Sequence, residues 1–174
     1  LDMLAAVDER DAVTQREQAY VRARLLMATS WRGRDERWEE AIRIGEAHGF
    51  GDILASRVEN ASWMAYRTRG DLAESIRLAD EAFDAYAAAG AHEGACQVLR
   101  GIGFSAFEIG ALDRGADLAR RCVEYARSVH LKFHEELALT DLAGEAFARA
   151  DDGRCHAVLD ELTSNTDFRA DLYR

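Results

Sequence analysis

Apolar residues recur at helical spacing in two stretches of the chain that lie forty residues apart, residues 69–83 and 109–123. In each copy the apolar positions extend three residues past the end of the stretch, and successive positions are four, three, four and three residues apart. They are Leu72, Ile76, Ala79, Phe83 and Tyr86 in the first copy, and Leu112, Ala116, Ala119, Val123 and Ala126 in the second. This spacing places the side chains on one face of a helix. Each stretch is therefore predicted to be one amphipathic helix with one buried face.

A second helical stretch precedes each of these helices. Residues 53–70, "ILASRVENASWMAYRTRG", end at Gly70, and residues 95–110, "ACQVLRGIGFSAFEIG", end at Gly110. Both are too long and too rich in alanine for strands, so each unit is predicted to be a helical hairpin. A weaker third copy covers residues 136–162, with Ala150 where the glycines stood, and residues 11–30 and 35–49 form an earlier pair.

Four hairpins of this kind predict a stacked architecture. A single hairpin cannot bury its apolar stripe alone, so neighbours must pack against one another. We predict an all-α fold over residues 1–174, a single domain in which about four helical hairpins form a right-handed α-α superhelix, or solenoid, with a concave and a convex side. Turns are expected near residues 30–35, 49–51, 70, 90, 110, 129 and 151. Phe83 is expected to be buried between hairpins.

Composition agrees with helices and excludes some functions. The chain has no proline, 13 glycines and 48% hydrophobic residues. Its formal net charge of -10 argues against nucleic-acid binding, which usually needs a basic face. There is no apolar run of about 20 residues and no signal peptide, so we expect no membrane contact through this domain.

Cysteine usage favours a cytoplasmic location. The three cysteines have neither paired metal spacing nor an even count, which suits a reducing compartment and helix-packing roles. The chain begins within a predicted helix and ends without a stop signal, so we also expect it to be a fragment of a longer protein.

The hairpins resemble the tetratricopeptide repeat, which has small residues where its helices cross, a glycine-acid turn and a large residue late in the first helix. The matching positions are Tyr66, Gly70, Asp71, Ser75 and Ala82 in one copy; Gly103, Gly110, Gly115 and more loosely Cys122 in the next; and Ala143, Ala146, Ala150 and Cys155 in the third. Three features depart from the pattern: Trp63 stands at a usually small position, proline is absent, and the period is forty residues instead of about thirty-four.

The forty-residue period resembles repeats in regulatory segments of bacterial signalling proteins, such as LuxR-type ATP-dependent transcription activators and some diguanylate cyclases. The resemblance implies a non-enzymatic protein-protein interaction or regulatory module of a bacterial signalling or transcription-regulatory protein. It would bind a peptide or partner domain in its concave groove.

In tetratricopeptide arrays the first helix of each hairpin lines the concave groove. By position, the resemblance assigns to this groove Arg57, Asn60, Met64, Arg67, Gln97, Arg100, Phe104, Phe107, Leu137, Thr140 and Phe147. Arginines mixed with apolar side chains suit a carboxylate-bearing or acidic partner segment. Arg57, Arg67 and Arg100 have no evident structural reason for their positions, whereas Arg77 lies on the opposite helix of its hairpin. The alternative for the three phenylalanines is that they fill gaps between hairpins.

The sequence offers little support for metal or catalytic chemistry. His130 and His134 stand four apart, but the stretch follows a predicted helix end, so we expect them to straddle a turn as solvated loop and helix-start residues. A zinc site needs three or four convergent ligands, and no third ligand is apparent. No phosphate loop, nucleophile elbow or convergent carboxylate pair is recognisable. We therefore expect no metal, no cofactor and no enzyme activity.

Two further hypotheses stay open beside the interaction module. One is a small-ligand sensor that controls an attached effector domain, and the other is a metal-dependent enzyme built around the two histidines. A deep closed pocket favours the sensor, and an open groove that spans several hairpins favours a peptide partner. An apolar face around Phe168, Leu172 and Tyr173 further predicts a homodimer.

Overall fold

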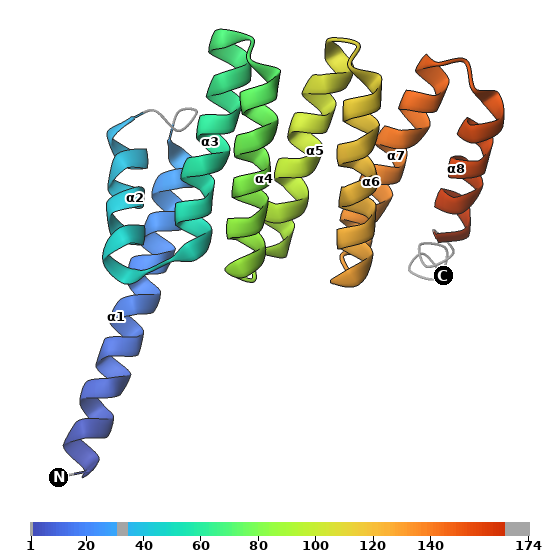
Figure 1. The fold of residues 1–174 in the computed structure, drawn as a ribbon. Coiled ribbons are helices and arrows are strands. Elements are labelled where there is room, and N and C mark those ends of the chain that lie inside the picture. Colours follow the sequence, from blue (N-terminus) through green and yellow to red (C-terminus); the bar gives the residue numbers. More distant parts are fainter. Residues whose placement is uncertain (1, 31–34, 166–174) are drawn as a thin grey trace.

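The computed structural model describes residues 2–30 and 35–165, which form helices joined by short turns (Figure 1). The eight helices of these ranges are α1 (Asp2–Thr29), α2 (Glu36–His48), α3 (Gly51–Arg69), α4 (Leu72–Ala88), α5 (His92–Glu108), α6 (Leu112–Ser128), α7 (Lys132–Ala148) and α8 (Asp152–Asn165). Within this part of the chain no residue is in a strand, so the prediction of an all-α protein is confirmed. The face predicted around Phe168, Leu172 and Tyr173 lies outside the described residues.

The helices pack one after another in chain order (Figure 1). They pair as α1–α2, α3–α4, α5–α6 and α7–α8, and each second helix also contacts the first helix of the next pair. In addition, α3 contacts α5 and α5 contacts α7, so the first helices of three successive pairs are neighbours. The predicted turns near 49–51, 70, 90, 110, 129 and 151 all fall between helices.

Glycines end several helices because the chain turns there through the left-handed region. Gly70 has a φ of 66° and Gly110 a φ of 79°, which cost a glycine little. At the equivalent place in the third copy, Ala150 adopts the same conformation with a φ of 56°, at a cost of about 1 kcal/mol. His130 does so with a φ of 60°, in the turn before α7.

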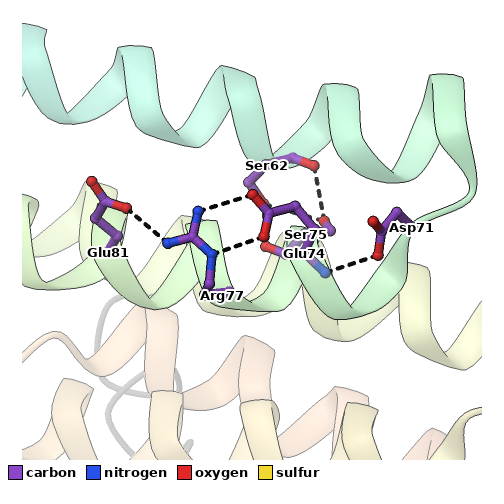
Figure 2. A network of polar contacts seen from close by, with 6 residues as sticks. All are labelled: Ser62, Asp71, Glu74, Ser75, Arg77 and Glu81. Atoms are coloured by element: carbon purple, nitrogen blue, oxygen red, sulfur yellow. Dashed lines mark hydrogen bonds and ion pairs between the residues drawn. The ribbon is translucent and has the colours of Figure 1, made fainter.

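Two serines hold α3 and α4 together where they cross (Figure 2). Ser62 Oγ donates to the backbone oxygen of Ser75 at 2.7 Å, and Ser75 Oγ donates to that of Ser62 at 2.9 Å. Both serines are buried, so each hydroxyl is satisfied by the facing backbone. The Asp71 side chain caps α4 by accepting from the Glu74 backbone nitrogen at 3.0 Å.

The predicted apolar stripes form much of the core. In α6 four of the five positions are buried, all but Leu112, and in α4 Ala79 and Tyr86 are buried. Phe83 is only half-buried; it packs edge to face on Tyr125 of α6, with ring centroids 4.8 Å apart. It therefore lies between hairpins as predicted, although less enclosed than expected.

Two of the cysteines belong to this core and are free thiols. Cys96 and Cys122 are buried, and the Cys122 thiol donates to the Cys96 backbone oxygen at 3.6 Å. Both are thus helix-packing residues, as predicted. The third, Cys155, is half-buried.

None of the helices in the described ranges is long and apolar enough to cross a membrane.

Candidate binding groove

A pocket of about 500 Å³ opens between α1, α3 and α5, and we call it the central pocket. Its floor is completed by a tryptophan of α2 and a tyrosine of α4. The lining residues are Arg24, Met27, Ala28, Trp38, Ser56, Glu59, Asn60, Trp63, Met64, Arg67, Tyr86 and Gln97. Side chains from three hairpins therefore converge on one cavity. Aromatic and thioether side chains supply its apolar surface, and a few amides and charges supply its polar groups.

Glu59 supplies the carboxylate of the central pocket. Tyr86 donates its hydroxyl to the Glu59 carboxylate at 2.6 Å, and the indole of Trp63 also hydrogen-bonds to this carboxylate. Desolvation raises the pKa of Glu59 above its ordinary 4.5, and the two hydrogen bonds offset part of that rise. Burial, followed by the nearby Glu59 charge, raises the pKa of Tyr86. The carboxylate is held in one orientation by two aromatic donors.

The two arginines of the pocket differ in their partners. Arg24 forms an ion pair of 3.5 Å with Asp52 at the start of α3. Arg67 is exposed near the end of α3 and forms neither an ion pair nor a hydrogen bond with any other residue that the structure describes. The guanidinium of Arg67 is thus available to a ligand carboxylate.

Two further pockets share lining residues with the central pocket. The first, which we call the α5-start pocket, has a volume of about 400 Å³ and shares Arg24, Tyr86 and Gln97 with the central pocket. The second, the α3-end pocket, has about 550 Å³ and shares Trp63 and Arg67 with it. The three pockets share lining side chains along α3 and α5, and we call them together the groove.

Four of the groove residues predicted from the sequence meet in the central pocket: Asn60, Met64, Arg67 and Gln97. Arg57 does not line any of the three pockets; it is exposed and pairs with Glu46 of α2 at 3.0 Å.

Arg100 has a structural partner, contrary to the prediction. Its Nε donates to Asp141 Oδ2 of α7 at 2.9 Å, and its Nη2 lies 3.3 Å from Oδ1. The two side chains are 26% and 15% exposed, so the pair is largely withdrawn from water. The expectation that Arg100 has no structural reason for its position is wrong, because the pair links two first helices.

The three phenylalanines have different surroundings. Phe107 is half-buried and covers Gly115, where a Cβ atom would lie 2.8 Å from the ring Cζ. The gap-filling alternative is therefore confirmed for Phe107. Phe104 and Phe147 are 57% and 76% exposed.

The two remaining predicted groove residues lie on α7, away from the three pockets. Leu137 is half-buried, and Thr140 is exposed and donates its hydroxyl to the Glu136 backbone oxygen at 2.8 Å.

The two histidines straddle a turn, as predicted, but they have different environments. His130 is exposed in the turn, whereas His134 is only 6% exposed on α7 and its Nδ1 has no hydrogen-bond partner. The interpretation of His134 as a solvated residue is therefore wrong, and desolvation lowers its pKa. No three His, Cys, Asp or Glu side chains of the described ranges are grouped so that they could hold a metal ion.

Sequence reasoning missed the part of the pocket that the first hairpin contributes. Arg24 and Met27 stand forty residues before Met64 and Arg67, so extending the same offset by one more copy would have found both. Trp38, Glu59 and Tyr86 lie outside the face assigned to the groove, and no local signal marks them.

Comparison of the chain with models of known protein families, with curated proteins and with solved structures gives no match. The function is therefore inferred from the geometry of the groove.

Proposed function

We propose that the chain is a tetratricopeptide-like solenoid that acts as a non-enzymatic interaction module and binds an extended segment of a partner protein in its groove. The repeated offset of forty residues, the packing of helices in chain order and the contacts between α3, α5 and α7 support a stacked array. Its resemblance to regulatory segments further suggests a role in a bacterial cytoplasmic signalling protein.

The observation that carries the proposal is the succession of pockets in the groove. The central pocket draws on three hairpins and shares lining residues with a further pocket on either side. A small molecule would need one enclosed cavity, whereas an extended segment needs a succession of neighbouring subsites. Three pockets that share lining residues suit the second kind of ligand.

The chemistry of the groove also suits a peptide. Trp38, Trp63 and Met27 offer apolar surface for a large side chain, because aromatic and thioether groups bury much area and adapt in shape. The exposed amide of Gln97 can both donate to and accept from a peptide backbone. Arg67 can pair with an acidic residue of the segment.

A selection of random 12-residue peptides displayed on phage, followed by calorimetry with the enriched peptides, tests the proposal. Ala28 is an exposed residue that lines the central pocket, so Ala28→Trp fills part of it. Ala73→Trp is the matched control, because Ala73 is exposed on α4 and lines none of the three pockets. We expect Ala28→Trp to weaken the enriched peptides at least about tenfold and Ala73→Trp to bind like the parent. Equal binding by both variants would place the binding surface elsewhere.

A small-ligand sensor is the second candidate. The central pocket alone, at about 500 Å³, falls within the usual range of about 300–1,000 Å³ for small-molecule sites, and it contains the enclosed carboxylate of Glu59. A metabolite screen by thermal shift tests this candidate. A compound that raises the melting temperature of the parent and of Ala73→Trp, but not that of Ala28→Trp, would support it.

A further inference from the structure

The charges that remain unpaired along the groove point to one class of partner segment. Building on the proposed function, we infer that the groove selects a short extended peptide with a cationic residue at the α5-start pocket, a large apolar residue in the central pocket and an acidic residue at Arg67.

At the α5-start pocket the available charge is the carboxylate of Glu93. The Asp52 carboxylate in this pocket already accepts from the Tyr20 hydroxyl at 2.7 Å and pairs with Arg24. The ring Nδ1 of His92 lies 2.7 Å from the Tyr125 hydroxyl. The Glu93 side chain is exposed and forms no ion pair or hydrogen bond among the described residues, although its charge acts on the buried His134 of α7. A peptide lysine or arginine at this end would therefore gain a carboxylate that no protein group occupies.

At the other end the available cation is Arg67, which lines both the central pocket and the α3-end pocket. Glu108 also lines the α3-end pocket, is exposed and has no partner among the described residues. Because Glu108 does not border the central pocket, the acidic residue of the peptide is best placed where the central pocket and the α3-end pocket meet. Removing the Glu108 charge should then strengthen binding of that acidic residue.

Glu93 and Arg67 are separated by a distance that a short peptide can span. The forty-residue offset places Arg67 level with position 107 of the neighbouring α5, fourteen residues beyond Glu93. At about 1.5 Å per helical residue this corresponds to about 20 Å along the groove. An extended chain advances about 3.3 Å per residue, so about six residues separate the cationic and acidic positions of the peptide.

The opposite arrangement of charges is disfavoured by the same groups. A peptide in reversed polarity would bring a carboxylate against Glu93 and a cation against Arg67, and like charges in contact weaken association. Because these charges do not set the direction of the peptide chain, a peptide of either sequence order can present its cation to Glu93 and its acidic residue to Arg67. The groove is thus expected to select one basic and one acidic residue at this spacing, in either order along the peptide.

The test is a parallel phage selection of 12-residue peptides on the parent protein and on the variant Arg67→Glu, which places an acidic side chain at both ends of the groove. Arg67 is exposed, and the melting temperatures of both proteins are measured first. The matched control is Arg114→Glu on α6, which makes the same charge change at an exposed arginine outside the three pockets. The Arg114 side chain, like that of Arg67, forms no ion pair or hydrogen bond among the described residues.

We expect the parent to enrich peptides that carry one basic and one acidic residue about six apart, in either order, with a large apolar residue between them. Arg67→Glu is expected to enrich peptides with two basic residues at that spacing instead. Measured by fluorescence anisotropy, each peptide set should prefer its own protein by about tenfold or more, because at one end a charge-assisted contact is replaced by a contact of like charges. Arg114→Glu should retain the preference of the parent, and Glu108→Gln should bind the parent's peptides more tightly.

Two different results would overturn the inference. Enriched peptides that are blocked by Ala28→Trp but bind the parent and Arg67→Glu equally would show that the groove binds peptides without selecting their charges, which leaves the proposed function intact. The absence of any enriched peptide that depends on the groove, on either protein, would contradict the inference and the proposed function together.

Discussion

Replacing Gly115 with alanine is expected to destabilise the protein, although alanine is normally the better helix former. Gly115 lies within α6, and the ring of Phe107 on α5 occupies the place where a Cβ atom would stand. The Cβ would lie 2.8 Å from the ring Cζ and closer still to two other ring carbons, so the ring or the helix must shift. Overpacking of this kind costs about 1–3 kcal/mol, which outweighs the gain of about 0.5–1 kcal/mol in helix propensity.

The sign of this effect should reverse when the ring is removed. In a Phe107→Ala background the Cβ added by Gly115→Ala has room, so only the propensity term remains and the substitution should stabilise by about 0.5–1 kcal/mol. The propensity term is common to both backgrounds, so the two substitutions are coupled by the overpacking cost alone, about 1–3 kcal/mol.

Urea unfolding of the four proteins of this cycle, followed by circular dichroism, measures the coupling. Gly144→Ala is the matched control, because Gly144 is exposed on α7 and a Cβ added there would meet no atom within 4 Å; it should stabilise the parent by about 0.5–1 kcal/mol. A change of the same sign at Gly115 in both backgrounds would refute the argument that Phe107 requires a glycine beneath it.

Three other predictions concern stability. Phe83→Ala should lower the free energy of unfolding by about 2 kcal/mol, less than for a fully buried ring, because Phe83 is half-buried against Tyr125. A change below about 0.5 kcal/mol in urea unfolding would contradict this packing. Arg100→Met should lower the free energy of unfolding by about 1–3 kcal/mol, because it leaves the largely buried Asp141 carboxylate of α7 unpaired. Arg57→Met removes an exposed pair and should change the free energy of unfolding by less than about 0.5 kcal/mol. Equal costs would contradict the difference in burial. Burial raises the pKa of Glu59, so the folded state holds the carboxyl proton more tightly than the unfolded state. The stability of the parent relative to Glu59→Gln should therefore fall as pH rises from about 4.5 through the raised pKa. A difference that is independent of pH in urea titrations would exclude a raised pKa.

The helices and their turns could be predicted because the signals for them are local. Apolar spacing within one helix and a glycine such as Gly70 in the left-handed conformation are both properties of a few neighbouring residues. Ala150 also adopts this conformation, and its turn could be predicted because it lies forty residues after Gly110. The order of the helices then follows from short connections.

The groove could be predicted only in part, because whether a residue lines it depends on contacts between helices. Arg100 and Arg67 look alike in the sequence, yet Arg100 meets Asp141, forty-one residues away on another helix, and Arg67 meets no charged partner among the described residues. A repeat offset indicates which positions are equivalent. It does not show which equivalent positions acquire a partner from the neighbouring hairpin.

The difference between Phe107 and Phe147 illustrates the same limit. The two residues occupy equivalent positions one repeat apart. Phe107 packs onto α6 because Gly115 leaves room for its ring. Phe147 is 76% exposed, and the position equivalent to Gly115 holds Cys155. The repeat offset shows that the two positions are equivalent, but it does not show which aromatic residue is buried.

Glycines also determine where along the array the central pocket forms. A Cβ at Gly94 would lie 2.7 Å from ring atoms of Tyr86, and a Cβ at Gly101 would lie 2.7 Å from the indole of Trp63. These glycines are seven residues apart and thus lie on one face of α5, where they admit the two aromatic residues that orient Glu59. Forty residues on, the equivalent positions hold a histidine and an aspartate, and forty residues before they hold a leucine and an alanine. The pocket therefore depends on a departure from the repeat at one helix, which explains why three hairpins converge on a single site instead of repeating it along the chain.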